Sequence, residues 1–148
     1  MGFSTGLGME RLYTVIVETP KGAFTKRNEY GAIDLISPIP CPFNYGRLEG
    51  FDGKDGDPLD AIVLGKKRMY QEICRLPIVG QVLFIDRGME DHKIILSASP
   101  PSRMDRISLH TFFRFYARIK NLTNLQRKSN CRTAFLGLEC KEINLFDD

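Results

Sequence analysis

The feature that most constrains the fold is a series of short segments rich in β-branched and aromatic residues. They occupy residues 11–18, 61–64, 78–85 and 93–96, and each is bounded by glycine, proline or charged residues. Runs of about four to eight such residues between turn signals are typical of β-strands, and several at this spacing favour a small barrel or sandwich. We therefore expect a fold built on short strands.

One segment has a different period and predicts a helix. Ser102 and Asp105 fit the capping-box pattern that begins helices, directly after two prolines. Apolar residues then recur at helical spacing, at Leu109, Phe112, Phe113, Tyr116 and Ile119. This stripe is suited to burial against the strands, while the hydroxyl group of Tyr116 is able to project toward a site.

Composition and charge fit a single globular domain. The 148 residues are 43% hydrophobic and 26% charged, and the net charge of +3 is too small and dispersed to indicate nucleic-acid binding. No apolar run approaches the roughly 18 residues of a membrane span, no signal-peptide pattern begins the chain, and the four cysteines lack metal-site spacing. We expect one domain over residues 1–148, with residues 1–10 as a flexible segment, in the cytoplasm and not at a membrane.

Residues 52–60 read Asp-Gly-Lys-Asp-Gly-Asp-Pro-Leu-Asp and place four carboxylates within nine positions. Carboxylates this close together repel one another unless water surrounds them or cations neutralise them. A polar surface turn is one explanation, because Asp, Gly and Pro are the usual turn residues. A site for bound cations is the other.

A second acidic set favours the cation site. Asp86, Asp91 and Lys93 lie between two predicted strands, at the mouth of an expected hairpin that can face the first acidic stretch. Two carboxylate clusters with a lysine beside them suit hard cations bridged by phosphate oxygens. Oxygen ligands without His or Cys favour Mg²⁺ over Zn²⁺.

Four motifs follow one another along the chain. They are Asn44-Tyr45-Gly46, Asp55-Gly-Asp57-Pro-Leu-Asp60, Val79-Gly80 and the stretch from Asp86 through Asp91 to Lys93. With these motifs, from about Val15 to Tyr116, the chain resembles the soluble family I inorganic pyrophosphatases. The resemblance implies a mainly β fold with flanking helices (α+β), as a five-stranded OB-like closed barrel with one main amphipathic helix packed on it. It also implies Mg²⁺-dependent hydrolysis of pyrophosphate to two phosphates, and a homo-oligomer.

Carried over position by position, the resemblance implies a role for each matching residue. Asp57 is expected to act as the catalytic base, which orients and deprotonates the water that bridges the metals. The expected metal ligands are Asp55, Asp57, Asp60, Asp86 and Asp91. The expected substrate-binding residues are Arg27, Tyr45, Lys93 and Tyr116, and the acidic residues expected to orient outer-shell waters are Glu18 and Glu29.

The chain departs from the family pattern among the residues expected to bind phosphate. Arg27 stands where a lysine is expected, Ile33 where an arginine is expected, and Ala117 where a lysine is expected. A hydrogen bond to a charged group contributes roughly 1.5–3 kcal/mol, so losing two costs about two to four decades in rate. Cations close in sequence are candidates to replace them, or are ordinary exposed side chains: Arg47, Lys54, Arg118 and Lys120.

Two functions therefore remain open on the sequence alone. The first is an inorganic diphosphatase that depends on Mg²⁺ and is slowed by its missing cations. The second is a catalytically weakened or inactive relative that serves as a module for binding Mg²⁺ and phosphate. Hydrolysis of a nucleotide is disfavoured, because no glycine-rich loop is offered to a polyphosphate.

Overall fold

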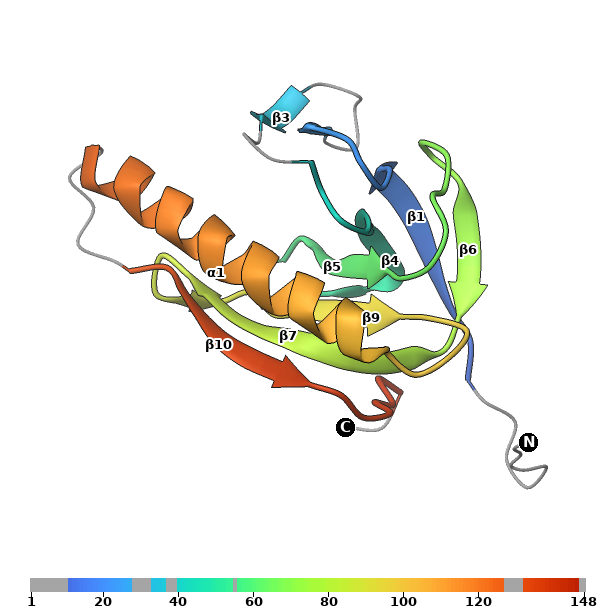
Figure 1. Cartoon of the computed structure of the whole chain (residues 1–148). Helices are drawn as coiled ribbons and strands as arrows, with labels where there is room; N and C mark the ends of the chain where they lie inside the picture. Colours follow the sequence, from blue (N-terminus) through green and yellow to red (C-terminus); the bar gives the residue numbers. More distant parts are fainter. Residues whose placement is uncertain (1–10, 28–32, 37–39, 55, 127–131, 147–148) are drawn as a thin grey trace.

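The computed structural model describes residues 11–27, 33–36, 40–54, 56–126 and 132–146, which form ten strands and one helix (Figure 1). These are β1 (Tyr13–Thr19), β2 (Thr25–Arg27), β3 (Ile33–Ile36), β4 (Asn44–Asp52), β5 (Pro58–Val63), β6 (Ile73–Leu76), β7 (Ile78–Asp86), β8 (Met89–Glu90), β9 (Lys93–Leu96), α1 (Arg103–Gln126) and β10 (Ala134–Glu139). The prediction of a mainly β fold with one main helix is confirmed. Within the described parts of the chain, no helix is long and apolar enough to cross a membrane.

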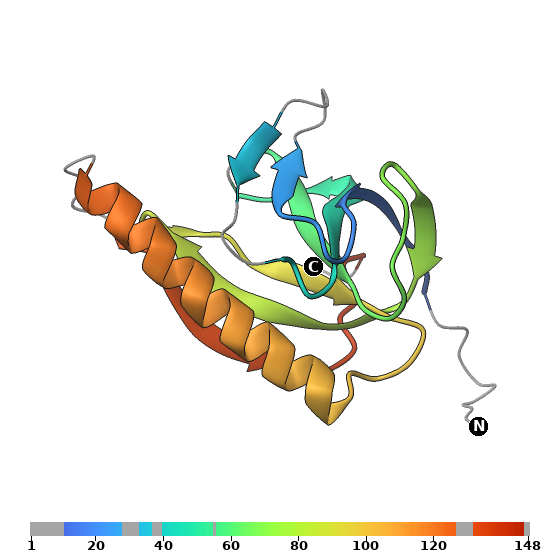
Figure 2. The ribbon, with the colours of Figure 1, turned by 45° about the horizontal axis from the view of Figure 1, so that its top comes forward.

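Eight strands form one sheet in the order β10-β7-β9-β5-β4-β1-β6, with β8 paired to β7. Strands β5 and β9 run parallel, and the other neighbours are antiparallel. Strands β2 and β3 form a separate two-stranded sheet, which Figure 2 shows apart from the main one. The main sheet therefore holds all four strands expected from the sequence, with β6 and β10 at its ends.

The main sheet is open, which differs from the closed barrel that the resemblance implied. Its five central strands, β7, β9, β5, β4 and β1, match the number expected for such a barrel. Closure requires β7 to pair with β1, but β10 pairs with β7 and β6 pairs with β1. A strand has two hydrogen-bonding edges, so these pairings leave no edge for closure among the described strands.

The central strands are buried on both faces. Ile62 of β5 and Ile95 of β9 join the core cluster beneath α1, together with Phe113 of the helix. Their neighbours Val63 and Leu96 join a second cluster on the opposite face. Successive side chains of a strand point to opposite faces, so alternate residues of β5 and β9 supply the two clusters.

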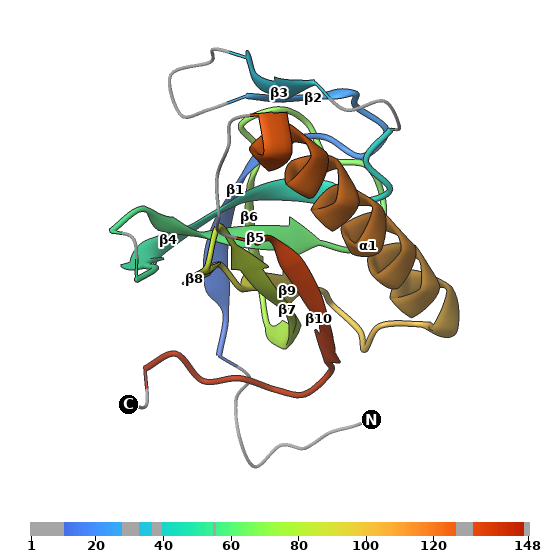
Figure 3. The same cartoon turned by 90° about the vertical axis from the view of Figure 1, so that its left-hand side faces the viewer.

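Helix α1 begins with the expected capping box and lies beside β10 and β7 (Figure 3). The backbone N–H of Asp105 donates to Oγ of Ser102 at 3.0 Å, and the N–H of Ser102 donates to Oδ2 of Asp105 at 2.9 Å. Leu109 and Phe113 then face the sheet and are buried. The helix thus covers one face of the sheet along its length.

Two of the motif glycines, Gly46 and Gly80, allow strands to approach closely. A Cβ atom on Gly46 would overlap the backbone carbonyl oxygen of Ile16 in β1. A Cβ atom on Gly80 would overlap the carbonyl oxygen of Glu139 at the end of β10. Both glycines are therefore required by strand packing rather than by turn conformation.

We predict that Gly46→Ala destabilises the fold by at least about 2 kcal/mol, because rigid backbone must move to admit the methyl group. Urea unfolding measures the effect. Gly50→Ala is the control, since Gly50 has a φ of +88° and open space around it. Its cost is limited to the strain of the left-handed conformation, about 1 kcal/mol. A Gly46 variant no less stable than the Gly50 variant would contradict the packing role.

Candidate functional site

A buried lysine lies at the centre of the candidate site. The Lys93 side chain is 2% exposed, and its Nζ donates to Oδ2 of Asp60 at 2.7 Å and to Oδ2 of Asp91 at 2.6 Å. Parallel pairing of Ala61 with Ile94 brings the preceding residues, Asp60 and Lys93, side by side. The site therefore depends on the β5–β9 pairing, which joins the two acidic motifs of the sequence.

Two tyrosines stand against this cluster. The hydroxyl of Tyr45 donates to Oδ2 of Asp60 at 2.9 Å. Burial and the charge of Asp60 raise the pKa of Tyr45 well above its usual value. Burial also raises the pKa of Tyr116 to about 12, although the charge of Lys93 works in the opposite direction. Both hydroxyls therefore remain protonated at neutral pH and can donate hydrogen bonds.

The charges of the cluster act strongly on one another. Burial raises the pKa of Asp91, Lys93 opposes this effect, and the nearby carboxylates of Asp60 and Asp86 add to it. Burial works to lower the pKa of Lys93, but Asp60 and Asp91 outweigh it and raise that pKa above its usual value. The carboxylates are thus crowded enough to gain from a nearby cation.

Asp86, at the end of β7, is held from two sides. The Thr133 hydroxyl donates to Oδ1 of Asp86 at 2.9 Å, and Nζ of Lys120 lies 3.4 Å from Oδ2. Asn121 fixes Thr133 in turn, because its side chain accepts from the Thr133 backbone N–H at 2.9 Å and donates to the Thr133 carbonyl at 2.7 Å. The second half of α1 therefore forms one wall of the site.

These side chains share one face of the sheet. Tyr45 and Ile62 belong to the cluster beneath α1, and Asp60 lies two residues before Ile62 on β5. Lys93 and Asp86 likewise lie two residues from Ile95 and Phe84 of that cluster. The site is consequently a polar end of the core that α1 covers.

The remaining predicted residues belong to other segments of the described chain or lie outside the described residues. Asp57 is exposed and immediately precedes β5. Glu18 of β1 forms an ion pair with Arg47, with 2.8 Å between the guanidinium nitrogen and the carboxylate oxygen. Asp55 and Glu29 lie outside the described residues. Arg27 belongs to β2, but its side chain also lies outside the description.

Two residues of the site were not predicted from the sequence. Thr133 holds Asp86 directly and Asn121 holds Thr133. They are separated from Asp86 by 47 and 35 positions in the sequence and belong to no motif. Small polar residues are too common for their presence alone to indicate such a contact. Folding brings them together because β10 pairs with β7, α1 packs beside β10, and the rings of Phe113 and Tyr116 on α1 pack on Phe84 of β7.

The donor chemistry of the site fits a hard divalent cation. The described candidates are all carboxylates, and those of Asp60 and Asp86 are near enough to Asp91 to raise its pKa. Hard cations such as Mg²⁺ prefer oxygen ligands of this kind. Among the described residues, no group of three or more Asp, Glu, His or Cys is already arranged to hold a metal ion. The Lys93 ammonium supplies one positive charge to the two carboxylates of Asp60 and Asp91 in this arrangement.

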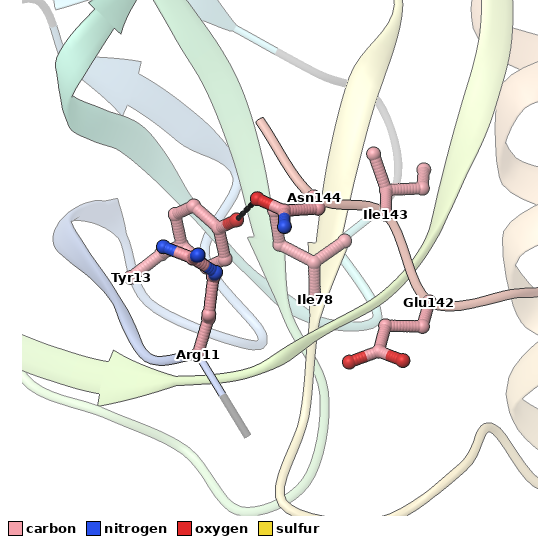
Figure 4. Close-up of a pocket in the computed structure, with 6 residues that line it drawn as sticks. All are labelled: Arg11, Tyr13, Ile78, Glu142, Ile143 and Asn144. Carbon is pink, nitrogen blue, oxygen red and sulfur yellow. Dashed lines mark hydrogen bonds between the residues drawn. The ribbon is translucent and has the colours of Figure 1, made fainter. Parts of the chain in front are cut away.

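The structure also has a separate cavity of about 230 Å³, and Figure 4 draws the residues around it. It is lined by Arg11, Tyr13, Ile78, Glu142, Ile143 and Asn144. Ile78 begins β7 whereas Asp86 ends it, and Tyr13 and Ile78 belong to the core cluster on the face away from α1. This cavity contains none of the predicted site residues.

We predict that Lys93→Met lowers the free energy of unfolding by about 3 kcal/mol near neutral pH, because Asp60 and Asp91 lose their buried counter-ion. The loss should shrink toward about pH 4. Without Lys93 the pKa of Asp91 rises further, so acid neutralises the unpaired carboxylate. Urea unfolding at both pH values measures this.

Lys54→Met serves as the control, because Lys54 is 73% exposed and pairs with Glu90 at 3.2 Å. An exposed ion pair of this kind contributes roughly 0–1 kcal/mol. If both substitutions lowered the free energy of unfolding equally, the ion pairs of Lys93 would not be the contacts on which the site depends.

Comparison with known proteins gives a consistent result. Residues 15–134 match the family model described as inorganic pyrophosphatase. The chain is 32% identical to the inorganic pyrophosphatase of Sulfolobus acidocaldarius over 113 residues, covering 71% of this chain and 64% of that protein. It is 28% identical to the soluble inorganic pyrophosphatase of Oryza sativa subsp. indica over 138 residues, covering 78% and 64%. The chain thus spans 64% of the length of these curated relatives.

Solved structures show the same fold. An inorganic pyrophosphatase from Helicobacter pylori has a TM-score of 0.70 at 20% identity, covering 92% of this chain and 91% of that one. One from Coxiella burnetii has a TM-score of 0.70 at 25% identity, covering 93% and 90%. The mainly β architecture described above is therefore shared with these proteins.

Proposed function

The chain belongs to the inorganic pyrophosphatase family, and on that premise we propose that it hydrolyses inorganic pyrophosphate to two phosphates with Mg²⁺ as cofactor. The observation that carries the proposal is the Lys93 ammonium held between Asp60 and Asp91, with the Tyr45 hydroxyl on the same carboxylate. This arrangement combines a fixed cation, fixed donors and crowded carboxylates at one point. Such a set is suited to an anion made of two linked phosphate groups, bound together with metal ions.

The metal ions would be held by carboxylates from three parts of the chain. We assign this role to Asp55, Asp57, Asp60, Asp86 and Asp91. Its support is the placement of Asp60 on β5, of Asp86 at the end of β7 and of Asp91 between β8 and β9, together with the effect of the other two charges on Asp91. When bound, Mg²⁺ neutralises phosphate charge and lowers the pKa of the attacking water.

Three donors are assigned to the phosphate oxygens. Lys93 has three N–H groups, and the contacts to Asp60 and Asp91 use two of them. Burial raises the pKa values of Tyr45 and Tyr116, so both hydroxyls stay protonated. Tyr45 donates its one proton to Asp60 here, and it would turn to a phosphate oxygen when a metal ion takes that carboxylate. The carboxylates of Glu18 and Glu29 would orient outer-shell waters, and Arg27 is a fourth proposed donor. These donors would orient the substrate so that one phosphorus faces the attacking water.

Asp57 is proposed as the base. In the reaction a water oxygen bonds to one phosphorus, the bridging P–O bond breaks, and Asp57 takes the proton from the water. A tight turn places it: the N–H of Gly53 donates to the Asp57 carbonyl at 2.7 Å, and Gly56 has a φ of +86°. Asp57 therefore lies directly before β5, three residues before Asp60.

A cytoplasmic location, a homo-oligomer and a single domain over residues 1–148 belong to the same proposal. The name of the Oryza sativa relative, a soluble inorganic pyrophosphatase, supports a soluble protein, and the cytoplasm is the compartment that we propose for it. The open edges of β6 and β10 among the described strands offer surfaces on which copies can associate.

We predict that Asp57→Asn lowers turnover of pyrophosphate by about 100- to 10,000-fold, because the amide cannot accept the proton. Magnesium binding should persist through the other carboxylates. Phosphate release measures the first effect, and titration calorimetry with Mg²⁺ measures the second.

Asp52→Asn is the matched control, since Asp52 is an exposed carboxylate of the same acidic stretch without an assigned role. It should keep turnover within about two-fold, in the range of ordinary surface substitutions. Full activity of the Asp57 variant would remove the proposed base, and a loss of Mg²⁺ binding would make the residue a ligand only.

A further inference from the structure

Lys120 lies one helical turn after Tyr116 on α1, and its ammonium reaches the proposed site. Its Nζ lies 3.4 Å from Oδ2 of Asp86 and 5.6 Å from the centre of the Tyr116 ring. These neighbours are a proposed metal ligand and a proposed substrate-binding residue. From this geometry we infer that Lys120 binds a phosphate group of the substrate, an inference that rests on the function proposed above.

Position 117 does not carry this charge, because its side chain belongs to the core. Ala117 is 7% exposed and packs in the cluster beneath α1. A charged group at that depth would be costly without a partner. Residues four apart share a face of a helix, so Lys120 lies on the same face as Tyr116 and is better exposed, at 26%. The chain therefore presents the cation one turn further along the helix.

The contact between Lys120 and Asp86 is loose enough to be exchanged. Charge-assisted hydrogen bonds between nitrogen and oxygen are usually about 2.7–2.9 Å long, and those of Lys93 measure 2.7 and 2.6 Å. The 3.4 Å distance of Lys120 exceeds that range. Asp86 also keeps the Thr133 hydroxyl at 2.9 Å on its other oxygen. The ammonium can thus turn to a phosphate oxygen while Asp86 retains a partner.

The other candidate cations are differently placed. Arg47 forms an ion pair with Glu18 at 2.8 Å, which is within the usual range for a charge-assisted hydrogen bond. Lys54 is 73% exposed and pairs with Glu90. Arg118 is exposed on α1. Lys120 combines a loose ion pair, partial burial and a position between two residues of the site.

The test compares Lys120→Met with Lys120→Arg and with Lys141→Met. Lys141 is a matched control, because it also lies near a carboxylate, Glu139, at 3.7 Å, but is 65% exposed. Three quantities are measured for each: the KM and kcat for pyrophosphate, the dissociation constant of inorganic phosphate in the presence of Mg²⁺, and that of Mg²⁺ alone.

We expect Lys120→Met to raise KM and the phosphate dissociation constant about 10- to 100-fold, the loss of one hydrogen bond to a charged group. Mg²⁺ binding should be unchanged or tighter, because a competing cation has left Asp86. Lys120→Arg should restore phosphate binding to within a few-fold, and Lys141→Met should match the wild type.

Phosphate binding by Lys120→Met equal to that of the wild type would overturn the inference. So would equal weakening of Mg²⁺ and phosphate binding, since that result assigns Lys120 to the support of Asp86. A wild-type protein that binds phosphate but releases none from pyrophosphate would refute the proposed activity, while the phosphate measurements would still decide the role of Lys120.

Discussion

The site depends on the ion pairs of one buried lysine. Lys93 is 2% exposed, and a charge at that depth is tolerated only with partners that compensate its lost hydration. Asp60 and Asp91 provide them at 2.7 and 2.6 Å. The partners in turn are crowded carboxylates that require a positive charge. Parallel pairing of β5 with β9 makes this mutual compensation possible, because it aligns two motifs that lie 33 positions apart in the chain.

The two faces of the sheet differ: one carries the candidate site and the other carries a second apolar core cluster. The face beneath α1 carries Tyr45, Asp60, Asp86 and Lys93 at one end of a core cluster, where the helix adds Tyr116. The opposite face is filled by a second cluster, of which Tyr13, Ile78 and Ile143 also line the 230 Å³ cavity. An apolar core on both sides of β5 and β9 holds the strands rigidly. The polar groups at their ends are thereby fixed before any ligand binds.

Local sequence patterns predicted the strands and the helix well, but they did not predict contacts between elements that are distant in the sequence. The strand at residues 78–85 and the capping box at Ser102 appear as β7 and the start of α1, since both depend on short-range periodicity. The open sheet was missed, because the pairing of β6 and β10 at the edges leaves no local signal. For the same reason Thr133 was not foreseen. The carboxylates and Lys93 were identified through motifs, and their mutual distances required the structure.

The most direct test of the central claim is phosphate release from pyrophosphate by the purified chain, measured with Mg²⁺, with excess chelator, and after Mg²⁺ is restored. If the carboxylates gathered around Lys93 hold metal ions for catalysis, release occurs with Mg²⁺, stops with the chelator and returns with the metal. A protein that binds Mg²⁺ and phosphate but releases no phosphate from pyrophosphate would contradict the claim. That result would leave these residues as a binding site without hydrolysis.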